Sequence, residues 1–198
     1  MKFSYVFLLI YLLPCACANE PWIQIKENNQ DLRFDHFTAK LPPGWMRLAK
    51  KTEIYWARPA GDITSTKVNR AFLSRDGLNL EEIDIIRFEL KDAFPSLNKQ
   101  ADLSLLPSEL AELFIAETKT VSGLENIQVI ENLPMRIANH DGFMVHMRYK
   151  ISKGLPIEIL AYGFTNKYGF YVFTFKAPGL HFFPTFLPEV NQIVNSAR

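Results

Sequence analysis

Five short apolar segments, separated by tight polar turns, fill residues 127–176 and constrain the fold more than any other part of the sequence. The segments cover residues 127–131, 135–138, 143–150, 156–164 and 170–176. Turn-forming residues at 139–142 and 166–169 separate neighbouring segments. Connections this short suit antiparallel neighbours, because a parallel crossover needs roughly a dozen residues or more. The sequence therefore predicts an antiparallel meander.

Further strands are predicted in the first half of the chain, at residues 32–40, 53–58, 67–74 and 82–90. A turn at 75–77 separates the last two, so we expect a hairpin there. Residues 42–44 are Pro-Pro-Gly, which cannot continue a ladder or a helix. We expect this turn to bring Trp45 onto the body of the domain.

The spacing of apolar residues predicts a helix that begins near Pro107 and ends at Gly123. Proline suits the first turn of a helix, where its missing N–H would have no partner. The apolar residues at helical spacing are Leu106, Leu110, Leu113, Phe114 and Val121.

A second amphipathic helix closes the chain. Its apolar positions are Phe183, Phe186, Leu187, Val190, Ile193 and Val194. With Thr185 as the N-cap, Pro188 falls in the first turn, where it costs little. Two such helices need apolar cover, so the sequence predicts an α+β fold with a central antiparallel sheet and helices packed on it.

The first eighteen residues are typical of an export signal. Lys2 supplies a positive charge, residues 6–13 form an apolar run, and residues 16–18 have small side chains. Cleavage between Ala18 and Asn19 would leave a single domain, residues 19–198, in the periplasm. The apolar run is too short to span a bilayer, and no later run is long enough to form a transmembrane segment.

Both cysteines of the chain, Cys15 and Cys17, lie in this leader. Cleavage after Ala18 would therefore exclude disulfides, a cysteine nucleophile and a cysteine-ligated metal. The alternative is a lipoprotein in which Cys17 is acylated and anchors the domain to a membrane. Pro14 occupies the position where such a leader usually has leucine, so we favour periplasmic release.

The charge balance argues against nucleic-acid binding. The chain has 22 basic and 21 acidic residues and no block of like charge. The nearest approach to a basic patch is Arg47, Lys50 and Lys51, followed by Arg58. We interpret it as a solvated strand end.

A serine hydrolase is the enzymatic alternative. Ser96 and Lys99 have the spacing in which a lysine can deprotonate a serine nucleophile. The companion motifs of penicillin-recognising enzymes are missing, as are the usual acyl-transfer and phosphate-binding motifs. We therefore expect residues 96–99 to form a solvated loop.

The four histidines show no spacing that would place two metal ligands on one helical face. His146 lies in the middle of a predicted strand, where we expect a hydrogen-bonded sheet histidine. His140 lies in a turn beside Asp141, where we expect a solvated pair. The sequence thus predicts no metal site and no cofactor.

Aromatic residues crowd the last forty positions. Both faces of the predicted strand at 170–176 carry apolar side chains, so we expect both to be covered by helices. The corner formed by His181, Phe182 and Phe183, before the final helix, is expected to remain exposed. We predict it as a surface for a partner protein or an apolar ligand.

Several segments resemble the PsbP-like superfamily, which includes the DcrB-type exported bacterial proteins. The similar segments are residues 37–45 (strand, Pro-Gly and Trp), 142–143, 162–164 and 171–178, with a final helix that runs to 194–196. The resemblance implies an antiparallel sheet between helices, an α/β/α sandwich without catalytic residues. It also implies an accessory or binding role in the cell envelope, in contact with a partner protein or an apolar ligand.

Overall fold

The computed structural model describes residues 22–26, 30–48, 54–56, 66–76, 80–122, 126–151 and 154–198. Three predictions lie outside these ranges. They concern the leader with its cleavage point, the helix stop at Gly123, and most of the basic cluster (Lys50, Lys51 and Arg58).

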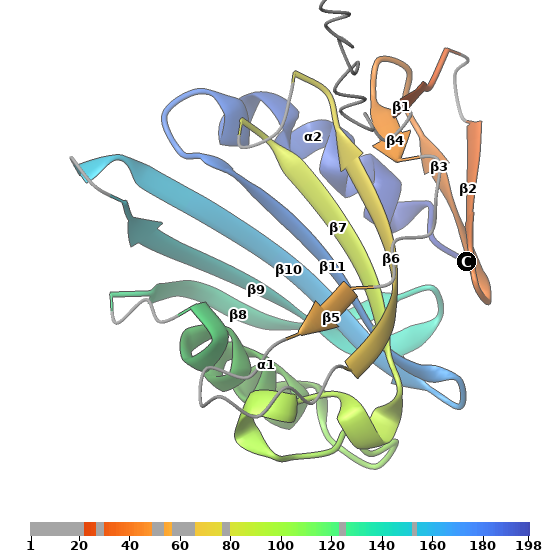
Figure 1. Cartoon of the computed structure of the whole chain (residues 1–198), viewed down its shortest axis with the longest axis vertical. Helices are drawn as coiled ribbons and strands as arrows, with labels where there is room; N and C mark the ends of the chain where they lie inside the picture. The colour runs from red at the N-terminus through yellow and green to blue at the C-terminus, as the bar shows by residue number, and fades with distance from the viewer. Residues whose placement is uncertain are drawn as a thin grey trace, which may run out of the picture.

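One large antiparallel sheet forms the centre of the molecule (Figure 1). Its path runs β1-β4-β6-β7-β11-β10-β9-β8, and β5 pairs with β6 beside this path. The strands on this path and β5 are β1 (Trp22–Gln24), β4 (Met46–Leu48), β5 (Ile54–Trp56), β6 (Thr66–Ser74), β7 (Glu82–Phe88), β8 (Gln128–Ile137), β9 (His140–Lys150), β10 (Pro156–Asn166) and β11 (Gly169–Pro178).

The predicted meander is confirmed, because β8, β9, β10 and β11 pair in sequence as antiparallel neighbours. The two strands expected at 127–131 and 135–138 are, however, one continuous strand, β8. A β-bulge shifts its register between Val129 and Glu131. Pro134 lies within β8 and is tolerated there because β8 is the last strand of the sheet path.

The prediction of a single strand at 32–40 is wrong. The segment folds into a separate hairpin of β2 (Gln30–Phe34) and β3 (Phe37–Leu41). The chain reverses at Asp35, whose φ of 48° is one that aspartate adopts more readily than most residues. The turn that follows β3 places Trp45 in the core, fully buried, as expected.

The first helix, α1 (Pro107–Ser122), begins at the predicted proline. Leu110 on its inner side is buried, whereas Leu106 precedes the helix and is 61% exposed instead of lying on the apolar face. The Leu106 N–H donates to the Glu109 carboxylate at 2.8 Å, which satisfies an end group of the helix.

The prediction of Thr185 as N-cap is wrong, because α2 (Phe182–Asn195) begins three residues earlier. The Thr185 N–H already donates to the carbonyl four residues back, at 3.2 Å. Pro188 therefore lies inside the helix. The earlier start places the Phe183 ring on Phe175, with 5.2 Å between centroids, and this burial offsets part of the cost of the hydrogen bond that Pro188 cannot make.

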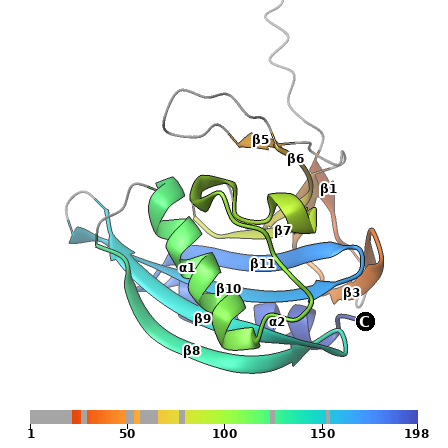
Figure 2. The same ribbon diagram turned by 90° about the horizontal axis from the view of Figure 1, so that it is seen from below.

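The two helices cover opposite faces of the sheet (Figure 2). α2 and the β2–β3 hairpin enclose one core, which contains Trp45, Phe173 and Val190. α1 encloses the other, which contains Phe143 and Phe170. The fold is thus the α+β sandwich predicted from the sequence.

Candidate ligand-binding cavity

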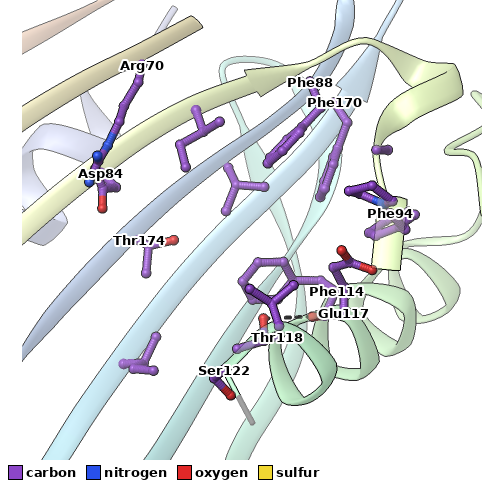
Figure 3. A pocket seen from close by; sticks show the side chains of 16 residues that line it. Arg70, Asp84, Phe88, Phe94, Phe114, Glu117, Thr118, Ser122, Phe170 and Thr174 are labelled. Atoms are coloured by element: carbon purple, nitrogen blue, oxygen red, sulfur yellow. Dashed lines mark hydrogen bonds and ion pairs between the residues drawn. The ribbon is translucent and has the colours of Figure 1, made fainter. Parts of the chain in front are cut away.

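A cavity of about 470 Å³ lies on the α1 side of the sheet. α1 contacts β8, β9 and β10, and the cavity lies where the same sheet face continues onto β11 and β7 (Figures 2 and 3). Two 3-10 helices, η1 (Leu90–Asp92) and η2 (Pro95–Leu97), lie in the segment that connects β7 to α1. Phe94 and Pro95 of this segment form part of the wall.

Strand and helix periodicity explains which side chains line the cavity. On β7 and β11, alternate residues face α1, and the register places them opposite one another: Phe88 with Phe170, Ile86 with Val172, and Asp84 with Thr174. On α1, the lining residues Phe114, Glu117, Thr118 and Val121 recur at helical spacing. The cavity therefore follows from the same patterns that form the core.

One part of the cavity, which we call the aromatic end, consists of Phe88, Phe94, Phe114 and Phe170. The Phe170 ring lies 5.2 Å from Phe94 and 6.1 Å from Phe88, centroid to centroid. Glu117 fixes the wall to α1, because its carboxylate accepts the Ser96 N–H at 2.9 Å and the next N–H at 3.1 Å. The aromatic end is thus held by contacts among β7, β11, α1 and the segment at residues 94–97.

The opposite part, which we call the polar end, consists of Arg70, Asp84 and Thr174 (Figure 3). The Arg70 guanidinium donates through Nε to Asp84 Oδ1 and lies over the Phe72 ring at 4.7 Å. Burial raises the pKa of Asp84, and the hydrogen bond from Arg70 opposes that rise. Burial thus disfavours the charged form of Asp84, and the hydrogen bond from Arg70 stabilises that form.

A mainly apolar cavity with a few polar groups in its wall is suited to holding a small molecule. Its volume lies within the range of roughly 300–1,000 Å³ typical of small-molecule sites. In the described ranges, no three His, Cys, Asp or Glu side chains gather as metal ligands would. None of the helices described has the length and apolarity needed to cross a membrane.

The structure does not place Ser96 and Lys99 in one helical turn. Ser96 lies in η2, and Asn98 then adopts a left-handed conformation with φ 53°. Lys99 forms a β-bridge back to Phe94. Because the chain reverses between them, the three-residue spacing does not place serine and lysine on one helical face.

At the corner before α2, His181 is exposed and Phe182 is half-buried. The expected exposure of Phe183 is wrong, because its ring is buried between Phe175 and His146. A role of this corner in binding a partner remains a prediction.

His146 is a hydrogen-bonded sheet histidine, as expected. Its Nε2 lies 2.8 Å from Glu158, and Arg148 donates to the same carboxylate at 2.6 Å. Glu158 is almost fully buried, and in the β9–β10 register it lies directly opposite Arg148, two residues from His146 on β9. His140 is expected from the sequence to form a solvated pair with Asp141. Its ring instead stacks on Phe164, with 5.1 Å between centroids.

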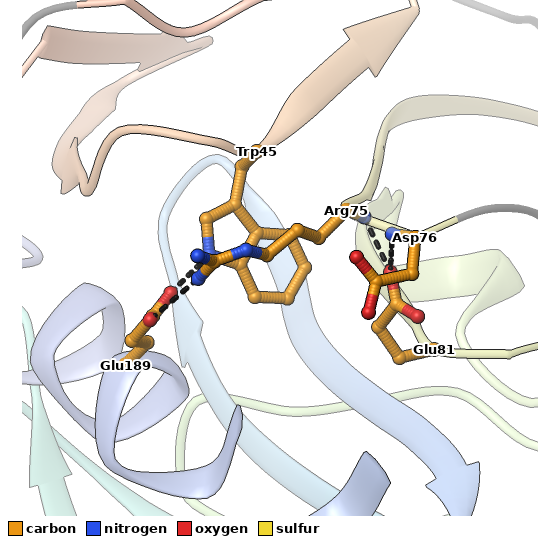
Figure 4. A network of polar contacts seen from close by, with 5 residues as sticks. All are labelled: Trp45, Arg75, Asp76, Glu81 and Glu189. Carbon is orange, nitrogen blue, oxygen red and sulfur yellow. Dashed lines mark hydrogen bonds and ion pairs between the residues drawn. The ribbon is translucent and has the colours of Figure 1, made fainter. Parts of the chain in front are cut away.

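A second polar network joins three distant segments (Figure 4). Glu189 of α2 accepts from the Trp45 indole N–H at 2.7 Å and from Arg75 Nη1 at 2.6 Å. Just before β7, the Glu81 carboxylate accepts the backbone N–H groups of Arg75 and Asp76. The network stabilises the layer beneath α2, on the opposite face from the cavity.

Sequence reasoning missed the cavity. It treated the C-terminal aromatics as core, and Phe170 does contribute both to the core and to the cavity wall. The available signal was a pair of opposite charges, Arg70 and Asp84, inside strands at positions that face the same side as apolar residues.

The chain is an α+β sandwich with an apolar pocket beside one helix, and its fold is similar to that of PsbP. Cyanobacterial PsbP from Synechocystis is similar over 92% of this chain and 95% of that protein, with 12% identity and a TM-score of 0.54.

A mutant of the protein Mog1 is similar over 87% of this chain and 96% of its own, with 11% identity and a TM-score of 0.50. A protein of unknown function from Pseudomonas aeruginosa covers 84% of this chain and 93% of its own, with 9% identity and a TM-score of 0.47. No protein-family model and no curated protein matches the sequence. Similarity at this low identity shows the fold alone.

Proposed function

We propose that this protein is a non-enzymatic accessory domain of the bacterial cell envelope that binds an apolar small molecule in the cavity beside α1. The observation that carries the proposal is the cavity itself, about 470 Å³ in volume and lined mainly by apolar side chains. Burial of apolar surface on binding supplies the driving force, at about 25 cal/mol per Å² before the costs of association. The resemblance to DcrB-type exported proteins agrees with this role.

The uncharged dye N-phenyl-1-naphthylamine tests the cavity, because its fluorescence rises in apolar surroundings. We expect saturable binding of one dye per protein. Val121→Phe adds bulk to the cavity wall and should weaken binding at least about tenfold, about 1.4 kcal/mol. Leu106→Phe is the matched control, since Leu106 is exposed just before the same helix and should leave binding unchanged. Equal binding by both variants, or no binding by the native protein, would contradict the proposal.

We also propose that residues 1–18 are removed on export. The support is the sequence pattern of the leader, with small side chains before Asn19. The intact mass of protein recovered from the periplasm should equal that of residues 19–198. A mass that instead corresponds to a lipid-modified chain beginning at Cys17 would establish the anchored alternative.

A further inference from the structure

The polar end of the cavity has almost no net charge, although it is rich in charged groups. Arg70 and Asp84 form an ion pair across β6 and β7. Further along β7 and β11, Lys176 pairs with Glu82, the residue directly opposite it. Each cation is therefore matched by a carboxylate within the same patch of sheet.

The polar end also retains hydrogen-bonding capacity of both kinds. The ion pair uses Nε of Arg70 and Oδ1 of Asp84. The terminal nitrogens of Arg70 are donors, Oδ2 of Asp84 is an acceptor, and the Thr174 hydroxyl is both. Thr174 lies directly opposite Asp84 in the strand register, so these groups face one region of the cavity.

We propose that the ligand is an uncharged amphipathic molecule, with a hydroxyl-bearing or amide head at the polar end and an apolar chain at the aromatic end. This inference rests on the proposed function. A neutral head that donates and accepts can bond to Asp84 and to Arg70 at once. A carboxylate or ammonium head would instead place an extra, unbalanced charge beside an ion pair that is already neutral, in a poorly solvated place.

Three ligands with the same dodecyl-length chain separate these cases: 1-monododecanoylglycerol, dodecanoate and dodecylammonium. Each is titrated, below its critical micelle concentration, against the naphthylamine dye bound to the native protein at pH 7. We expect the glyceride to displace the dye at a concentration at least about tenfold lower than either charged ligand, a difference of about 1.4 kcal/mol. Equal or better displacement by a charged ligand would overturn the inference.

Dye binding distinguishes a failure of the head-group inference from a failure of the proposed binding function. If the dye binds but the glyceride does not displace it, the head-group inference fails while the binding function stands. If the dye itself does not bind, the proposed function fails and takes this inference with it.

A charge change at the polar end provides the second arm. Asp84→Asn leaves Arg70 without its carboxylate, so the preference should shift toward dodecanoate by at least about tenfold relative to the glyceride. Asp141→Asn is the matched control, because its side chain is 79% exposed and is not part of the cavity lining. Thr174→Val, which replaces a hydroxyl with a methyl group, should reduce the advantage of the glyceride, and it serves as the test if Asp84→Asn does not fold. An unchanged ligand order in the folded variants would contradict the inference.

Discussion

The hydroxyl of Tyr162 links the stability of the α2 layer to alkaline pH. It donates to Asn191 Oδ1 of α2 at 2.7 Å, and burial raises its pKa from 10.0 to about 12. Between these values the unfolded chain loses the phenolic proton before the folded chain does. The folded state then binds more protons than the unfolded state, so stability falls as the pH rises from 10 to 12.

Replacement of this tyrosine tests the pH dependence. Between pH 9 and 11.5, the native protein should lose about 1–2 kcal/mol more stability than Tyr162→Phe, measured by urea unfolding at each pH. Tyr171, whose pKa burial also raises to about 12, stays in both proteins and its effect cancels in the comparison. Parallel curves for the two proteins would show that Tyr162 does not titrate in this way.

Gly163 is fixed by close packing with Phe143 and not by its backbone conformation. A Cβ at this position would lie 2.4 Å from the Phe143 ring and 3.2 Å from Phe170. Gly163→Ala should therefore destabilise the protein by about 1–3 kcal/mol in urea unfolding. The double variant Gly163→Ala/Phe143→Leu should cost less than the sum of the two single changes, because the smaller side chain leaves room for the methyl group. Additive effects would argue against this packing.

At the scale of whole elements, Glu189 joins α2 to the turn before β4 and to the end of β6. Glu189→Gln keeps an acceptor for the Trp45 N–H but loses the charge that pairs with Arg75. Glu189→Ala leaves the indole N–H of a fully buried tryptophan without that partner. We expect Glu189→Ala to cost about 1–3 kcal/mol and Glu189→Gln clearly less, by chemical unfolding. Equal losses of stability in the two variants would show that only the ion pair with Arg75 contributes, and not the hydrogen bond from Trp45.

Element prediction from the sequence succeeded where local and global requirements agree. Short turns between apolar segments define the β9–β11 meander, and Pro107 marks the start of α1. It failed at the start of α2, where packing of Phe183 on Phe175 overrides the local preference for an N-cap at Thr185. It also failed at Asp35, because aspartate followed by histidine is not a strong turn signal.

The cavity could not be predicted from the sequence because it depends on how far one layer extends over another. Periodicity indicates that Phe170 and Val172 face inward, but it does not show where α1 ends relative to them. In the structure α1 contacts β8, β9 and β10, and the apolar face continues beyond these strands. Whether this apolar face forms a closed core or a pocket is therefore decided by tertiary packing.

For the whole molecule, the two faces of the sheet have different roles in this account. The α2 side is closed by Trp45, the β2–β3 hairpin and the Glu189 network, and it stabilises the fold. The α1 side leaves a volume that a ligand can fill. Binding should therefore perturb residues on the α1 side and leave the α2 side unchanged.

Contacts between the bound dye and the protein test this claim most directly. Isotope-filtered NOE spectra of the labelled protein with unlabelled N-phenyl-1-naphthylamine would report which methyl groups lie near the dye. We expect NOEs to the methyl groups of Ile86, Val121 and Val172, all of which line the cavity. NOEs confined to Val129 and Leu133, exposed on β8, or to the α2 residues Val190 and Ile193, would contradict the account.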